Sequence, residues 1–258
     1  MFRVFARIFF QTLGYEFKKL NSIDRIKGIR FSKQSSRGIT SHYNAMVENL
    51  IHKSGQNFCC IIIGAHNGES SDLYSLLSNK NIKVILIEPN PTIFKELKEN
   101  YSNNKKAVLL NIAITNSKSE LDFYIVNKDA YEPNKKNAFV DTISSLDKTH
   151  LLKHLKNLNP INESIETINT IKIQGDTLEN VMRNENINQP TVLQVDTEGF
   201  DAEIIKQLDI LGVKPEILYF EYCHLNDSDL CYCLDWLKSN NYCFVYDSLN
   251  ILAQQKKE

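Results

Sequence analysis

The sequence of 258 residues contains no long apolar run, no Cys-x-x-Cys pair and no internal repeat. A helix needs about 20 apolar residues to cross a bilayer, so no segment is expected to span a membrane. Residues 1–10 include two arginines and no small-residue cleavage site, which differs from a secretory signal. The six cysteines have neither disulfide nor zinc-site spacing, and reduced thiols of this kind predict a cytoplasmic protein.

The chain also lacks an excess of charge, since its formal net charge is −1. That value conceals a basic segment, because residues 1–37 contain nine Lys or Arg and two acids, a local charge of +7 that leaves −8 for the remainder. The main part is therefore acidic, and the basic residues gather in one terminal segment without the aromatic platform expected for single strands. We expect no nucleic-acid partner.

The basic segment has an amphipathic pattern. Between residues 2 and 20 the apolar side chains recur at three- to four-residue steps, and they are Phe2, Phe5, Phe9, Leu13 and Phe17. Two interpretations stay open: residues 1–30 contact an anionic membrane peripherally at its inner surface, or this helix packs against the folded domain. Residues 32–41 contain Ser, Lys and Gly and are predicted to be a linker, so a segment at 1–40 precedes a domain at 41–258.

Strand and helix patterns alternate from residue 58 onward. We predict a Rossmann-like α/β domain with a mostly parallel twisted sheet, helices on both faces and a C-terminal antiparallel hairpin. The predicted strands are 58–63, 83–88, 108–114, 121–126, 171–174, 191–196, 217–221, 242–246 and 249–254, and the predicted helices are 69–79, one opening at Pro91, 150–158, 178–182, 200–208 and 230–237. Residues 127–169 are irregular and form a candidate substrate lid.

The first predicted strand runs into a glycine turn, Gly64-Ala65-His66-Asn67-Gly68. Glycine lets the backbone turn sharply and lets a ligand approach closely. The turn lacks the third glycine of the dinucleotide fingerprint, so by itself it is a weak signal. The second strand ends at Glu88, 24 residues after Gly64, where an acid can accept hydrogen bonds from ribose hydroxyls. Together these features favour an adenosine-containing ligand.

Two carboxylates, Asp196 and Glu198, stand where a later apolar strand gives way to a helix. Ligands of open α/β sheets bind outside the carboxyl ends of the strands, so both acids would lie at that crevice. The structural alternative is that Asp196 caps the helix and Glu198 complements its positive end. Glu221 also ends a strand, and His224 follows it at the same end of the sheet. These residues share no compact metal-ligand motif, and no metal is expected.

The order of these motifs resembles that of the FkbM-type methyltransferases. The resemblance covers residues 58–222 and rests on the glycine turn, on the strand end Ile87-Glu88-Pro89-Asn90 and, most specifically, on Leu-Gln-Val-Asp-Thr-Glu-Gly at 193–199. It implies a class I methyltransferase fold that binds S-adenosylmethionine. It also implies methyl transfer to a hydroxyl of a sugar, a glycan or a related metabolite.

The same resemblance implies a set of cofactor-binding residues: Gly64, Ala65, His66, Gly68, Glu88, Asn111, Ala113 and Asp196. The glycine turn would surround the methionine part of the cofactor, and Glu88 would hold the ribose. Asn111 and Ala113, at the end of the third strand, would lie near the adenine. Asp196 and Glu198 would face the reaction centre.

Methyl transfer to a hydroxyl benefits from a base, because the proton must leave as the bond to carbon forms. The candidate catalytic residues are Asp196, Glu198 and His224, and Asp196 is favoured among them. Asp196 also has an alternative role, which is to orient the cofactor or the acceptor.

One position departs from the resemblance. The family usually has an acid two residues before the first glycine, where this chain has Ile62. That acid helps to hold the amino-acid end of the cofactor, so its loss would either weaken binding or shift the task to Asp196. A catalytically impaired binding or scaffold protein is therefore one alternative function. The other is a nicotinamide-dependent oxidoreductase, which the missing third glycine and the acids at 196 and 198 disfavour.

Overall fold

The computed structural model describes residues 36–69, 71, 73–78, 81–126, 144–149, 151–152 and 168–256. The amphipathic segment expected at residues 2–20, with its membrane contact, lies outside the described residues, as does most of the region 127–169. Of the helix expected at 150–158, residues 151–152 are described and are helical. Across the described ranges, no helix is long and apolar enough to cross a membrane.

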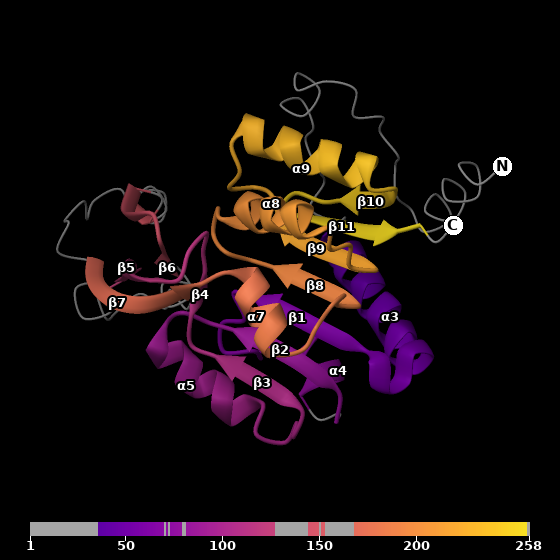
Figure 1. The fold of residues 1–258 in the computed structure, drawn as a ribbon, viewed down its shortest axis with the longest axis horizontal. Helices are drawn as coiled ribbons and strands as arrows, with labels where there is room; N and C mark the ends of the chain where they lie inside the picture. Colours follow the sequence, from indigo (N-terminus) through magenta and orange to yellow (C-terminus); the bar gives the residue numbers. More distant parts are fainter. Residues whose placement is uncertain are drawn as a thin grey trace.

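A seven-stranded sheet forms the centre of the fold (Figure 1). Its strands are β1 (Cys59–Ile63), β2 (Lys83–Ile87), β3 (Ala107–Leu110), β8 (Val192–Val195), β9 (Ile217–Glu221), β10 (Tyr242–Tyr246) and β11 (Asn250–Gln255). Their order is β10-β11-β9-β8-β1-β2-β3, and every neighbouring pair from β9 to β3 is parallel. β11 is antiparallel to both β9 and β10, which confirms the predicted C-terminal hairpin.

Both faces of this sheet are buried, which explains why its central strands are continuous apolar runs. In β1, Cys59, Ile61 and Ile63 pack on one face, and Cys60 and Ile62 pack on the other. The first face is covered by α7 (Leu178–Asn184), α8 (Asp201–Leu211) and α9 (Asp227–Ser239), and the second by α3 (Ser36–Ser54), α4 (Tyr74–Leu77) and α5 (Pro91–Asn100). These three layers confirm the predicted Rossmann-like α/β fold.

Helix α3 shows that the linker predicted at residues 32–41 is wrong from Ser36 onward. The buried residues Ile39, Tyr43 and Val47 recur every four positions and pack against the sheet. The Tyr43 hydroxyl also donates a hydrogen bond to Oε1 of Gln194 in β8, at 3.1 Å. The polar start of the helix concealed this apolar spacing, most of which lies beyond residue 41. The short 3-10 helix η1 (Gly55–Asn57) then leads from α3 toward β1.

The strand predicted at residues 108–114 is also wrong as a single element. β3 ends at Leu110, and the side-chain amide of Asn111 donates to the backbone oxygens of Glu88 at 2.8 Å and Pro89 at 3.0 Å. The chain then leaves the main sheet, and β4 (Ala113–Ile114) joins a second one. The helix predicted at 69–79 is shorter in the structure, where α4 spans Tyr74–Leu77. The start of α4 has no side-chain cap.

The second sheet stands beside the carboxyl ends of the central strands, at the left in Figure 1. It contains β4, β5 (Ser119–Val126), β6 (Ser144–Ser145) and β7 (Ile168–Asp176), in the order β4-β7-β5-β6. β5 pairs with β7 along its whole length, over a small core that includes Ala113, Phe123 and Ile173. The sequence predicted strands in β5 and β7 without predicting that they pair. This sheet supplies one wall of the site described next.

Candidate active site

The site lies where the strand order reverses between β1 and β8. From β1 the chain continues to β2 and β3 on one side, whereas β8 is followed by β9 on the other. Ligands of open α/β sheets bind at such a switch point. Ile63 is paired with Val195, and the backbone N–H of Asp196 donates to the oxygen of Ile63 at 2.9 Å. The glycine turn and the acidic segment therefore begin side by side.

Glycine is required at position 64 by this close approach. Gly64 has a φ of +78°, and a Cβ there would lie 1.7 Å from the backbone oxygen of Asp196. Gly68 has a φ of +77°, and a Cβ there would lie 2.5 Å from the ring of Tyr101. Gly68 thus serves the packing of the turn against α5 and its C-cap, and it does not reach the cavity described below.

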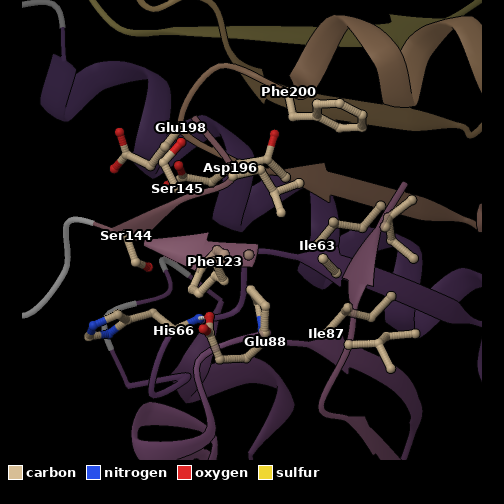
Figure 2. Close-up of a pocket in the computed structure, with 17 residues that line it drawn as sticks. Ile63, His66, Ile87, Glu88, Phe123, Ser144, Ser145, Asp196, Glu198 and Phe200 are labelled. Carbon is tan, nitrogen blue, oxygen red and sulfur yellow. Dashed lines mark hydrogen bonds between the residues drawn. The ribbon is translucent and has the colours of Figure 1, made fainter. Parts of the chain in front are cut away.

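A cavity of about 270 Å³ opens at the switch point (Figure 2). That volume is close to the lower end of ligand pockets, which hold roughly 300–1000 Å³. The predicted site residues in its lining are Gly64, His66, Glu88, Ala113, Asp196 and Glu198. The remaining lining residues are Ile63, Ile87, Pro89, Ile112, Ile114, Phe123, Ser144, Ser145, Leu146, Thr197 and Phe200. The structure therefore brings together motifs from β1, β2 and β8 with side chains from the second sheet.

Glu88 is held rigidly on one wall of the cavity. Its Oε2 accepts the backbone N–H of His66 at 2.9 Å, and its Oε1 accepts that of Asn90 at 2.8 Å. The residue is only 5% exposed. Burial raises the pKa of Glu88 to about 7, against the opposing effect of these hydrogen bonds, and the charge of Asp196 raises it further. Each carboxylate oxygen still has acceptor capacity for a ligand hydroxyl.

Asn111, Ala113 and Ala65 contribute in different ways. Ala113 lines the cavity, whereas Asn111 supports its rim through the two hydrogen bonds to the backbone of Glu88 and Pro89. Ala65 is 3% exposed, and its N–H donates to the oxygen of Ile87 at 2.9 Å. Asn111 and Ala65 therefore act through the loops that shape the cavity.

Carboxylates crowd the opposite wall. In Figure 2, Asp196 and Glu198 lie across the cavity from His66 and Glu88. Protein surrounds Asp196 on most sides and raises its pKa, although its side chain remains exposed toward the cavity. Burial, followed by the charges of Asp196 and Asp201, raises the pKa of Glu198 to about 7. Negative charge is thus concentrated beside the space for a ligand.

Asp201 supports this wall from the first turn of α8. It is 1% exposed, and its Oδ2 accepts a hydrogen bond from the Thr197 hydroxyl at 2.8 Å. Burial raises its pKa to about 7. The N-cap of α8 is Phe200, with no side-chain cap hydrogen bond, so Asp196 does not cap the helix. The sequence analysis assigned no role to Asp201. Its position as an acid in the first turn of the predicted helix is the signal that could have identified it.

His224 lies behind Glu198 and outside the cavity lining. Its Nε2 is 3.4 Å from Oε2 of Glu198 and 3.4 Å from Oε2 of Glu221. Burial raises the pKa of Glu221 to about 9, and the charges of Asp196 and Glu198 add to this effect. His224 therefore contacts the cavity wall through Glu198.

Two lining residues have left-handed backbone conformations. The φ of His66 is +51° and that of Glu198 is +54°. This region costs a residue with a Cβ roughly 1–2 kcal/mol, and such strain gathers at functional sites. Each lies three residues after the end of a strand, β1 for His66 and β8 for Glu198, and lines the cavity.

Ile62 is fully buried and belongs to the core beneath α3, whereas its neighbour Ile63 lines the cavity. The family's usual first-strand acid is thus absent from the site. Among the lining carboxylates, Asp196 is available for the cofactor's amino group.

The sequence matches the methyltransferase FkbM domain over residues 63–244. The chain belongs to this family. FkbM methyltransferases use S-adenosylmethionine, so the predicted family, fold class and cofactor are confirmed. No curated protein matches the sequence.

Solved structures of other methyltransferases are similar to this FkbM chain. A precorrin-6y C5,15-methyltransferase from Geobacter metallireducens GS-15 is 11% identical, with 83% of this chain and 87% of that chain covered and a TM-score of 0.40. The N-terminal domain of human METTL16 in complex with SAH is 12% identical, with 86% and 71% covered and a TM-score of 0.39.

The residues present fit S-adenosylmethionine. Glu88 offers acceptor oxygens for the ribose hydroxyls, and the apolar side chains of Ile87, Ile112 and Phe123 offer a surface for the adenine. Asp196 offers a carboxylate for the amino group. The methyl group of the cofactor is chemically activated, so the protein has to position it and exclude water.

Proposed function

We propose that this FkbM methyltransferase transfers the methyl group to oxygen, and that the acceptor is a hydroxyl of a sugar, a glycan or a related metabolite. The observation that carries the proposal is the carboxylate wall formed by Asp196 and Glu198 beside the cavity. Carboxylates are strong hydrogen-bond acceptors for hydroxyl groups. Ser144 adds a polar group from the second sheet. This lining suits an acceptor with several hydroxyls.

S-adenosylmethionine supplies, when bound, a methyl group activated on a sulfonium. Asp196 exposes its carboxylate to the cavity, and its two oxygens serve two roles. One faces the amino group of the cofactor, and the other accepts the proton of the attacking hydroxyl, a role that contributes about 10²–10⁴-fold to such reactions. Glu198 beside it accepts a hydrogen bond from a second hydroxyl, which orients the acceptor. Phe123 and Phe200 exclude water from the cavity.

The cofactor half of the proposal is tested by calorimetric titration with S-adenosylhomocysteine, which needs no acceptor. We expect one ligand per chain, and absence of binding at millimolar concentration would reject a functional cofactor site. A competing titration with a reduced nicotinamide cofactor is expected to give no binding.

The acceptor half is tested with S-adenosylmethionine labelled in its methyl group. Monosaccharides, glycosides and lipid-linked glycans are offered in parallel with an RNA oligonucleotide and a peptide. We expect label in a sugar methyl ether, identified by mass spectrometry and NMR. Label in RNA or peptide with none in the sugars would reject the proposed acceptor.

The isoleucine at position 62, where the family usually has an acid, favours a second function. In that function the protein binds the cofactor without transferring its methyl group. The variant Ile62→Asp places the usual family acid in the first strand, and Ile62→Asn is its isosteric neutral control. Because Ile62 is fully buried, only variants that circular dichroism shows to be folded are compared. If Asp196 holds the amino group in place of that acid, neither variant increases the affinity for S-adenosylhomocysteine. A gain that occurs only with Ile62→Asp would favour the impaired protein.

A further inference from the structure

A cluster of metal-ligand side chains lies behind the carboxylate wall, at the ends of β8 and β9. It consists of Glu198, Glu221, Cys223 and His224, and we call it the Glu221–His224 cluster. One ligand atom each from Glu221, Cys223 and His224 lies within 4.8 Å of the other two. The Nε2 atom of His224 is 3.4 Å from one oxygen of Glu198 and 3.4 Å from one oxygen of Glu221. Two segments, which follow β8 and β9, thus bring these side chains together.

These distances suit a tetrahedral ion better than a hydrogen bond. Nitrogen and oxygen ligands lie about 2.0–2.2 Å from Zn²⁺, so neighbouring ligands of a tetrahedron are about 3.3–3.6 Å apart. A charge-assisted N–H···O bond is shorter, at about 2.7–2.9 Å. The observed separation of 3.4 Å on both sides of His224 matches the former value.

The cluster also contains a buried carboxylate oxygen among several acids. The Oε2 atom of Glu221 is buried and accepts no hydrogen bond from the part of the chain that the structure describes. Asp196, Glu198 and Asp201 lie close enough for their charges to act on Glu221. Buried charges of like sign are costly unless they are paired or coordinate a metal. A divalent cation would relieve this repulsion.

We propose that Glu221, Cys223 and His224, with Glu198 beside His224 as the fourth ligand, bind one divalent transition-metal ion of the zinc class. Imidazole, thiolate and carboxylate are the ligand types that such ions take in proteins. Glu198 belongs both to this site and to the cavity lining, so the ion would fix one carboxylate of the pocket wall. The sequence predicted no metal, because Asp196, Glu198, Glu221 and His224 share no compact ligand motif.

The experiment uses the full chain, stripped with a chelator and titrated with Zn²⁺ by calorimetry and with Co²⁺ by absorption spectroscopy. Neither titration needs cofactor or acceptor. We expect one ion per chain, visible Co²⁺ bands typical of tetrahedral geometry, and a near-ultraviolet charge-transfer band from the Cys223 thiolate. Mg²⁺ is the comparison ion and is expected to bind far more weakly, because it prefers octahedral oxygen ligands.

Three variants remove ligands one at a time. Glu221→Gln and His224→Ala are expected to weaken Zn²⁺ binding at least about tenfold, since even indirect partners of a metal cost that much when removed. Cys223→Ser is expected to retain Co²⁺ while losing the charge-transfer band. The matched controls are Glu179→Gln, His52→Ala and Cys231→Ser, which lie outside the cluster and are expected to bind as the wild type does.

Circular dichroism establishes that each variant is folded. If a ligand variant does not fold, the wild type still provides a test, because Zn²⁺ that binds the native state raises its unfolding temperature. Binding that is absent in the wild type, or that persists in both Glu221→Gln and His224→Ala, would overturn the proposal and leave His224 as a neighbour of the two carboxylates without a metal. S-adenosylhomocysteine binding without Zn²⁺ binding rejects the metal site alone, whereas Zn²⁺ binding without sugar methylation rejects the proposed acceptor alone.

Discussion

The carboxylates on the two walls of the cavity differ in their hydrogen bonds and in their charged neighbours. On the wall from β1 and β2, both oxygens of Glu88 accept backbone N–H groups, from His66 and Asn90. On the wall that follows β8, burial raises the pKa values of Asp196, Glu198 and Asp201, and the charge of Asp196 raises those of the other two further. The first arrangement holds one carboxylate in a constant position for binding. The second keeps reactive negative charge at the cavity, and it suits the chemical step.

The largest expected effect is on the free energy of unfolding, and it is expected at Gly64, where the two walls meet. Gly64→Ala would place a Cβ 1.7 Å from the backbone oxygen of Asp196, which no side-chain movement can relieve. We expect a loss of more than about 4 kcal/mol in the free energy of unfolding by urea. Gly212→Ala is the matched control, because Gly212 has a φ of +65° with no atom within 4 Å of the added Cβ, and it should cost about 1 kcal/mol. Equal losses would show that the walls are not in contact there.

The next largest effect is expected on catalysis at the second wall. Asp196→Asn keeps the shape of the side chain and removes its basicity, so kcat should fall about 10²–10⁴-fold with the sugar acceptor found in the labelling assay. Asp235→Asn, on the exposed side of α9, is the control and should leave kcat unchanged. A rise in KM with normal kcat would instead give Asp196 the orienting role.

Glu88 on the first wall should make the free energy of unfolding depend on pH. Because the pKa of Glu88 is raised from 4.5 to about 7 in the folded protein, its ionisation favours the unfolded chain. Its contribution is fully present below about pH 4.5 and is lost as the pH rises through about 7, a difference of roughly 3 kcal/mol. Urea unfolding at pH 5 and pH 7.5 measures this decline, to which Asp201 adds with the same sign.

The decline should be smaller by roughly 2–3 kcal/mol in Glu88→Gln, which does not titrate. Asp122→Asn removes an exposed acid that pairs with Lys172 at 2.9 Å, and it should retain the slope of the wild type. An unchanged slope in Glu88→Gln would mean that Glu88 is ionised normally in the folded state.

The smallest of the four effects is expected on cofactor affinity. Glu88→Ala removes the acceptor for the ribose hydroxyls and should weaken S-adenosylhomocysteine binding by about 1.5–3 kcal/mol, measured by calorimetry. Glu179→Ala changes an exposed acid on α7 and serves as the control. An unaltered affinity in folded Glu88→Ala would remove Glu88 from the cofactor site.

The local pattern of apolar residues was sufficient to predict the strands that are buried on both faces. β1, β2, β8 and β9 are apolar runs with few alternatives, and the motifs at Gly64, Glu88 and Asp196 follow them directly. The same pattern did not predict strand ends that depend on contacts between residues distant in the chain. Asn111 ends β3 through hydrogen bonds to a loop 22 and 23 residues away in sequence, and no local signal shows these bonds.

The amino-acid sequence alone was enough to predict the family, the alternation of strands and helices, and the strand-end residues that meet at the switch point. It could do so because parallel strands place their carboxyl ends at one edge whatever the loops contain. The three-dimensional structure was needed to show that Gly68 packs against Tyr101, that Phe123 and Ser144 line the cavity, and that His224 lies between Glu198 and Glu221. Those contacts join residues distant in the chain, and their geometry follows from packing between sheets and loops.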